Sequence, residues 1–159
     1  MRVMPSQRQR GLFARRLQRG FTTIEAVMVM LIVVVVVGAL TPSVMRQITH
    51  ARVNRAANVL ASTFFLAQTL AGRQHSPVKL AFSTDNKSVV LSAASSATVL
   101  HTEWFGLTSE FKLDSFTPSS ATVLVLPNGR TTTSVTVTLS DGTYSRQVRM
   151  TSAGQIRVI

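Results

Sequence analysis

The residue types that could carry catalysis or bind a metal are few and dispersed in this sequence. No cysteine is present, and the three histidines (His50, His75 and His101) occur in neither an H-x-x-x-H nor an H-E-x-x-H spacing. No serine lies in a G-x-S-x-G turn. The carboxylates beyond the N-terminal region are Asp85, Glu103, Glu110, Asp114 and Asp141, and none lies within three residues of another. We therefore expect no enzymatic activity, no metal site and no cofactor.

Glu25 is the most informative charged residue. It lies between an arginine-rich segment that ends at Gly20 and an apolar run, residues 26–37, that contains no polar side chain. A carboxylate within hydrocarbon costs about 2.5–3.5 kcal/mol. Glu25 is therefore expected either to pair with a cation or to lie at the level of lipid headgroups.

Three arginines near the C-terminus form a second candidate group: Arg146, Arg149 and Arg157. They fall on the last predicted strands. There they form either the exposed side of a sheet or a patch that binds phosphates, such as those of DNA.

The apolar run predicts a membrane-spanning helix. Residues 21–41 would span about 31 Å as a helix, enough to cross a bilayer core. The first twenty residues contain six of the 17 basic residues and no acidic residue, so this end is expected to stay in the cytoplasm and the residues after about 42 to lie outside it. Without this segment, 11 basic and 6 acidic residues remain, and the net charge falls from +11 to +5.

A second helical segment follows, with apolar residues spaced by three or four. This pattern predicts that residues 43–74 form an amphipathic continuation of the helix, with Gly72 as a candidate stop. Pro42 removes one helical hydrogen bond, so a kink or a loosened turn is expected there. The face predicted to be buried comprises Val53, Ala57, Leu60, Phe64, Ala67 and Ala71.

From Pro77 onward the apolar residues alternate, which predicts strands near 78–82, 135–139, 148–150 and 156–158. Asp141-Gly142 is typical of a tight hairpin turn. Residues 92–120 are expected to form strands and a longer loop. The predicted fold class is α+β, with a long N-terminal helix packed on an antiparallel sheet domain over residues 75–159.

The stretch Gly20-Phe21-Thr22-Thr23-Ile24-Glu25, followed by the apolar helix, resembles the class III signal of type IV pilins and type II secretion pseudopilins. The resemblance implies that a prepilin peptidase removes residues 1–20, cuts between Gly20 and Phe21, and methylates the amine of Phe21. Pro42 falls where such proteins often carry a proline that interrupts the helix.

The remainder resembles the GspH/FimT subgroup of minor pseudopilins. The resemblance covers the second half of the helix, the first strand and the closing strands with their late glycine, Gly154. Ala67-Gln68 stands where that subgroup often has Ala-Arg. In FimT-type minor pilins linked to DNA uptake the tail can carry Gly-Arg-x-Arg, whereas this chain has Gly154-Gln155-Ile156-Arg157.

The resemblance implies a structural subunit of a type II secretion pseudopilus or a type IV pilus. Its partners would be prepilin peptidase, other pilin or pseudopilin subunits, and the lipid of the bacterial inner membrane before assembly. Glu25 of one subunit would pair with the Phe21 amine of a neighbour, which neutralises both charges and sets the register between helices.

The sequence is also compatible with two alternatives. The first is a FimT-type minor pilin that binds DNA in natural transformation. The second is an ordinary secreted β protein, because Val37-Gly38-Ala39 fits a conventional signal peptidase site and the mature chain would then begin at Leu40. This last reading leaves Phe21, Glu25 and Pro42 without a role.

Overall fold

The computed structural model describes residues 21–142 and 144–159. The predicted leader, residues 1–20, and with it Gly20, lie outside the described residues. The chain divides into two units, one ending at Leu40 and one comprising Thr41–Ile159.

A single helix, α1 (Thr23–Gln74), contributes to both units. In the first unit its apolar side chains from Ile24 to Val37 are each 49–72% exposed, so no part of the described chain covers them. Among the described residues, α1 is the one helix long and apolar enough to cross a membrane, a test that a signal sequence also passes. The helix assignment continues through Pro42, but the side chains of residues 40–42 lie outside the described part, so the kink remains a prediction.

In the second unit, α1 buries the face that its sequence period predicted. All six predicted core residues are fully buried, and Ala56 joins them. The helix ends two residues beyond Gly72, where His75 takes a left-handed conformation (φ 48°) and its N–H lies 3.4 Å from the Gly72 carbonyl.

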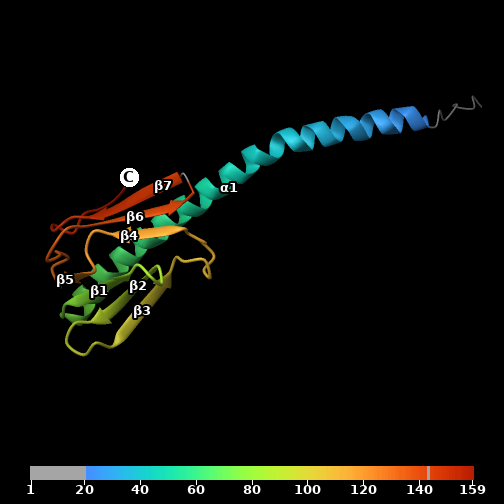
Figure 1. Ribbon diagram of the computed structural model, residues 1–159. Coiled ribbons are helices and arrows are strands. Elements are labelled where there is room, and N and C mark those ends of the chain that lie inside the picture. Colours follow the sequence, from blue (N-terminus) through green and yellow to red (C-terminus); the bar gives the residue numbers. More distant parts are fainter. Residues whose placement is uncertain (1–20, 143) are drawn as a thin grey trace, which may run out of the picture. The chain divides into compact units, whose positions relative to one another are not determined.

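Eight strands follow the helix and form two antiparallel sheets. The first sheet has the order β3-β2-β1-β5 and the second has the order β4-β6-β7-β8. In chain order the strands are β1 (Val78–Ser83), β2 (Ser88–Ala93), β3 (Val99–Trp104), β4 (Ser115–Pro118), β5 (Thr122–Val125), β6 (Val135–Asp141), β7 (Tyr144–Met150) and β8 (Ile156–Val158). Figure 1 shows these strands gathered around the second half of α1.

The predicted α+β class, with a helix packed on antiparallel strands, is confirmed. The sequence did not distinguish one sheet from two. The hairpin predicted here joins β6 to β7, but its turn begins one residue later than expected: Asp141 is still the last residue of β6 and pairs with Tyr144, and Gly142 follows it with φ 62°.

A chain of aromatic rings links the helix to both sheets. Phe64 of α1 contacts Phe82 of β1 with ring centroids 6.1 Å apart, and Phe82 lies 6.5 Å from Phe116 of β4. Phe116 in turn stacks on Phe105 at 5.6 Å, and Phe105 on Phe111 at 5.4 Å. The two sheets therefore share one core with the helix.

Candidate functional site

Glu25 lies in the first turn of α1, and its side chain is exposed. A carboxylate in a first helical turn is stabilised by the partial positive charge of the helix N-terminus. The described residues offer this carboxylate no ion pair, because their salt bridges are Arg55–Glu110 and His101–Glu103. Glu25 is therefore free to accept a cation from outside the described chain.

Thr22 holds the start of this helix, a role that we did not predict. Its hydroxyl oxygen accepts a hydrogen bond from the Glu25 N–H at 3.3 Å, and its carbonyl accepts one from the Ala26 N–H at 3.1 Å. The T-x-x-E spacing of Thr22 and Glu25 is that of a capping box, a signal that was present in the sequence. Phe21 precedes the cap and is 78% exposed.

The three C-terminal arginines do not form one patch. Arg149 of β7 lies directly opposite Arg157 of β8, and both residues are exposed. Arg146 also belongs to β7, but it lies an odd number of residues from Arg149 and so on the opposite face of the strand.

Arg146 belongs instead to a polar network between β7 and the helix. Its Nε donates to the Asn54 side-chain oxygen at 2.9 Å and to the Tyr144 hydroxyl at 2.9 Å. The Tyr144 hydroxyl donates to the same Asn54 oxygen at 3.0 Å. The guanidinium also lies 5.8 Å from the centre of the Tyr144 ring. This arrangement gives Arg146 a structural role in docking β7 on α1.

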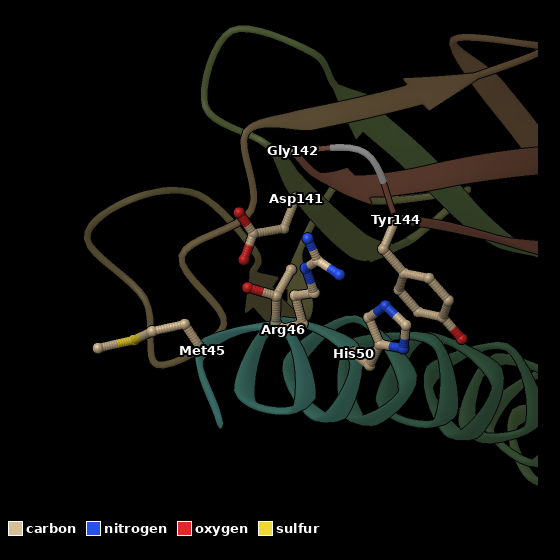
Figure 2. A pocket seen from close by; sticks show the side chains of 7 residues that line it. Met45, Arg46, His50, Asp141, Gly142 and Tyr144 are labelled. Atoms are coloured by element: carbon tan, nitrogen blue, oxygen red, sulfur yellow. The ribbon is translucent and has the colours of Figure 1, made fainter. Parts of the chain in front are cut away.

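A cavity of about 220 Å³ lies beside this network, between the helix and the tip of the β6–β7 hairpin. Figure 2 shows the side chains of Arg46 and His50 extending from the helix toward the hairpin, which carries Asp141 and Tyr144. The remaining lining residues are Met45, Thr49 and Gly142. No local sequence pattern indicates this cavity, because the helix and hairpin residues are far apart in the chain.

No part of the described chain gathers three histidine or acidic side chains in a way that could hold a metal ion. His101 and Glu103 lie 3.2 Å apart on β3, which is one of the two edge strands of the first sheet. Two such side chains offer a metal fewer ligands than the three or four of known zinc sites.

Residues 56–154 match the sequence profile of the family described as Type II transport protein GspH. The match covers more than half of the chain, from the middle of α1 to Gly154. The chain belongs to the GspH family. The predicted membership of the pilin-like GspH/FimT group is thereby confirmed, although the match begins after the segment that contains Phe21, Glu25 and Pro42.

Solved structures show the same fold for this GspH-family chain. The type IV minor pilin FimU of Pseudomonas aeruginosa is 15% identical, with a TM-score of 0.58 over 69% of this chain and 90% of FimU. The minor pseudopilin EpsH from the type 2 secretion system of Vibrio cholerae is 11% identical, with a TM-score of 0.56 over 68% of this chain and 96% of EpsH. A search of curated proteins finds none that matches the chain.

Family and fold together make the chain a pilin-like protein, and its family is one of structural proteins that interact with other pilin or pseudopilin subunits. The apolar first half of α1 fits an anchor in the inner membrane. One of the two solved relatives belongs to a pilus and the other to a secretion system, so the fold alone does not distinguish the two machines.

Proposed function

We propose that this chain is a minor pilin or pseudopilin, cut between Gly20 and Phe21 by a prepilin peptidase and then assembled into a secretion pseudopilus or a type IV pilus. The observation that carries the proposal is the unpaired carboxylate of Glu25 at the start of the apolar helix. In a chain of the GspH family, an exposed carboxylate opens an uncovered apolar helix and has no ionic partner among the described residues.

Cleavage would supply the missing partner. The new α-amine of Phe21 would be mostly protonated at neutral pH, since such amines have a pKa of roughly 7.7–8.0, and methylation would preserve the charge. Pairing between Glu25 of one subunit and this amine of the next neutralises both groups in an apolar setting, where an unpaired charge is costly. The same pair would fix the axial register of neighbouring helices.

Before assembly, the apolar half of α1 would anchor the subunit in the inner membrane. The basic leader would remain in the cytoplasm and the sheet domain would lie outside it. The mass of the mature N-terminus tests this processing in a host with an active prepilin peptidase. We expect a chain that begins with methylated Phe21; a chain that begins at Leu40 would instead identify an ordinary secreted protein.

The role of Glu25 is tested by comparing Glu25→Gln with Thr22→Ala. Glu25→Gln removes the charge, and we expect its recovery in filaments to fall at least roughly tenfold, a loss typical of one uncompensated buried charge. Its recovery in the membrane fraction should not change. Thr22→Ala removes only the helix cap and should still assemble. Normal assembly of Glu25→Gln would overturn the pairing, and so would equal defects in both variants, since the loss would then follow from a disturbed helix start and not from the missing charge.

The choice between the two machines needs a host that has both. Recovery of the chain in filaments sheared from the cell surface would identify a pilus subunit. Loss of protein secretion on deletion of its gene, with surface pili intact, would identify a pseudopilus subunit.

A second candidate function, DNA binding, is favoured by the arrangement of Arg149 and Arg157. These side chains lie directly opposite each other on an exposed sheet face, and neither forms an ion pair with a described residue. Like charges in directly opposite positions are destabilising, so an anionic ligand such as a DNA backbone would relieve the repulsion. Salt-sensitive DNA binding that is lost in a double Arg149→Ala, Arg157→Ala variant would support this function, and no binding at low salt would exclude it.

A further inference from the structure

The cavity between α1 and the β6–β7 hairpin combines a cation and an anion that no residue of the described chain neutralises. Arg46 is exposed at its edge and forms no ion pair with a described residue. Asp141 is partly buried, and its carboxylate has no hydrogen bond or ion pair with a described residue. Both line the same cavity of about 220 Å³.

The walls of the cavity are held in place by contacts between its lining residues and by contacts with residues behind them. The His50 ring stacks on Tyr144 with centroids 3.9 Å apart and planes inclined by 15°. The Tyr144 hydroxyl is fixed by Asn54 and Arg146. On the hairpin, the Gly142 N–H donates to the Asp114 carboxylate at 3.0 Å. The cavity is therefore preorganised, with its lining side chains held in position before a ligand binds.

Arg46 and His50 are four residues apart on α1, so they lie on one side of the helix and face the same ligand. Thr49 adds a hydroxyl on this wall. The opposite wall carries the Asp141 carboxylate (Figure 2). The lining thus offers N–H and O–H donors for a phosphate on one side and an acceptor for an ammonium group on the other.

The position of the cavity in the chain restricts what can reach it. Met45 lies five residues after Leu40, where the apolar unit ends, so the chain between them spans at most about 18 Å in any conformation. If the apolar unit spans the membrane, as proposed above, the cavity lies near the headgroups of the leaflet on the side of the sheet domain.

We infer that this cavity binds the phosphoethanolamine headgroup of a membrane phospholipid. Arg46, Thr49 and His50 contact the phosphate, and Asp141 accepts hydrogen bonds from the ammonium group. The cavity is smaller than the 300–1,000 Å³ typical of sites for drug-sized ligands, which suits a headgroup better than a folded partner. The inference rests on the proposed membrane anchoring.

The charges of the lining also select among headgroups. Phosphoglycerol has no cation for Asp141, and the trimethylated ammonium of phosphocholine has no N–H to donate to it. Arg146 does not line the cavity, and its Nε is already bonded to Asn54 and Tyr144. Arg46 and Asp141 are therefore the two residues to test.

The experiment uses the full chain in nanodiscs that contain equal amounts of phosphatidylethanolamine, phosphatidylglycerol and phosphatidylcholine. Native mass spectrometry then counts the lipids that stay bound to the released protein. We expect phosphatidylethanolamine to be retained roughly three- to tenfold over the other two, as for one or two partly solvated charge contacts. Asp141→Asn should abolish the preference over phosphatidylglycerol, and Arg46→Ala should lower the retention of all three lipids.

Arg73→Ala is the matched control, because Arg73 is an exposed arginine of the same helix that does not line the cavity. Retention equal to the control in both test variants, each with unchanged thermal unfolding, would overturn the inference. Arg46 is exposed, so Arg46→Ala should not disturb folding. If Asp141→Asn unfolds, Arg46→Ala alone still decides the test.

Two soluble competitors separate the possible sources of phosphate. Glycerophosphoethanolamine should displace the bound lipid at concentrations at which inorganic phosphate does not. Equal displacement by phosphate would assign a simple phosphate site and overturn the headgroup specificity.

The filament assay separates this inference from the proposed function. Unselective lipid binding by a chain that assembles normally would refute the headgroup site alone. An assembly defect in Arg46→Ala with unchanged retention of all three lipids would also refute it, since the cavity would then be a subunit contact. Selective lipid binding by a chain that never enters filaments would refute the proposed function alone.

Discussion

Gln68 ties two turns near the C-terminus of the chain to the helix. Its side-chain amide donates to the Gly154 carbonyl at 2.7 Å and to the Gly129 carbonyl at 3.1 Å. A glycine is needed at position 154 because its φ is 86° and because a Cβ there would collide with the Gly129 carbonyl oxygen. The late glycine noted in the sequence is therefore required by packing as well as by backbone conformation.

Replacement of Gly154 by alanine should destabilise the fold by about 3 kcal/mol. This value is the sum of the free-energy cost of a left-handed conformation for alanine and the cost of the clash between its Cβ and the backbone. Thermal unfolding of the chain in detergent should show a melting temperature lower by roughly 10 °C. Gly129→Ala is the control, since Gly129 has a similar φ of 80° but open space around it, and should cost only about 1–2 kcal/mol. Equal losses in the two variants would show that conformation alone matters.

The second half of α1 places two adjacent phenylalanines in opposite environments. Phe64 is fully buried against Phe82, whereas Phe65 is 65% exposed. The helical period predicted this difference, because Phe64 falls on the apolar stripe and Phe65 does not. At the scale of this element, local spacing alone was enough to find the core.

Phe64→Ala should therefore cost about 3–5 kcal/mol, because it removes a large ring from a closed core and leaves a cavity. Phe65→Ala should change the stability by no more than about 0.5 kcal/mol. Denaturant unfolding of both variants measures the contrast. Similar midpoints for the two variants would mean that the helix does not pack on the sheets through the face described above.

Across the whole molecule, the sequence predicted features that depend on neighbouring residues and missed those that depend on distant ones. Strands such as β1 and β6 alternate cleanly, and the Asp141-Gly142 turn has its own local chemistry. The division into two sheets depends on pairings such as β1 with β5, which leave no local pattern. Residues 92–120, rich in Ser, Ala and Thr, carry too little alternation to place β3 and β4.

The candidate sites follow the same rule. Glu25 was found because a charge in an apolar run is conspicuous. The cavity was missed because it joins residues about 90 positions apart, as the Tyr144–Asn54 bond illustrates. The odd spacing of Arg146 and Arg149 already places them on opposite faces of a strand, but the contacts of Arg146 with Asn54 join distant parts of the chain and leave no local pattern.

The second unit should fold without the first. Every buried apolar residue of the described chain lies between Val53 and Met150, so none belongs to the unit that ends at Leu40. A fragment of residues 41–159 should be soluble and should unfold cooperatively within a few degrees of the full chain in detergent. Gel filtration measures the solubility of the fragment, and circular dichroism measures its unfolding.

A fragment that begins at Asn58 is the control, because it lacks Val53 and the neighbouring alanines of the core and should melt at a much lower temperature. A fragment of 41–159 that binds hydrophobic dyes and unfolds without a transition would show that the membrane half of α1 contributes to the core after all.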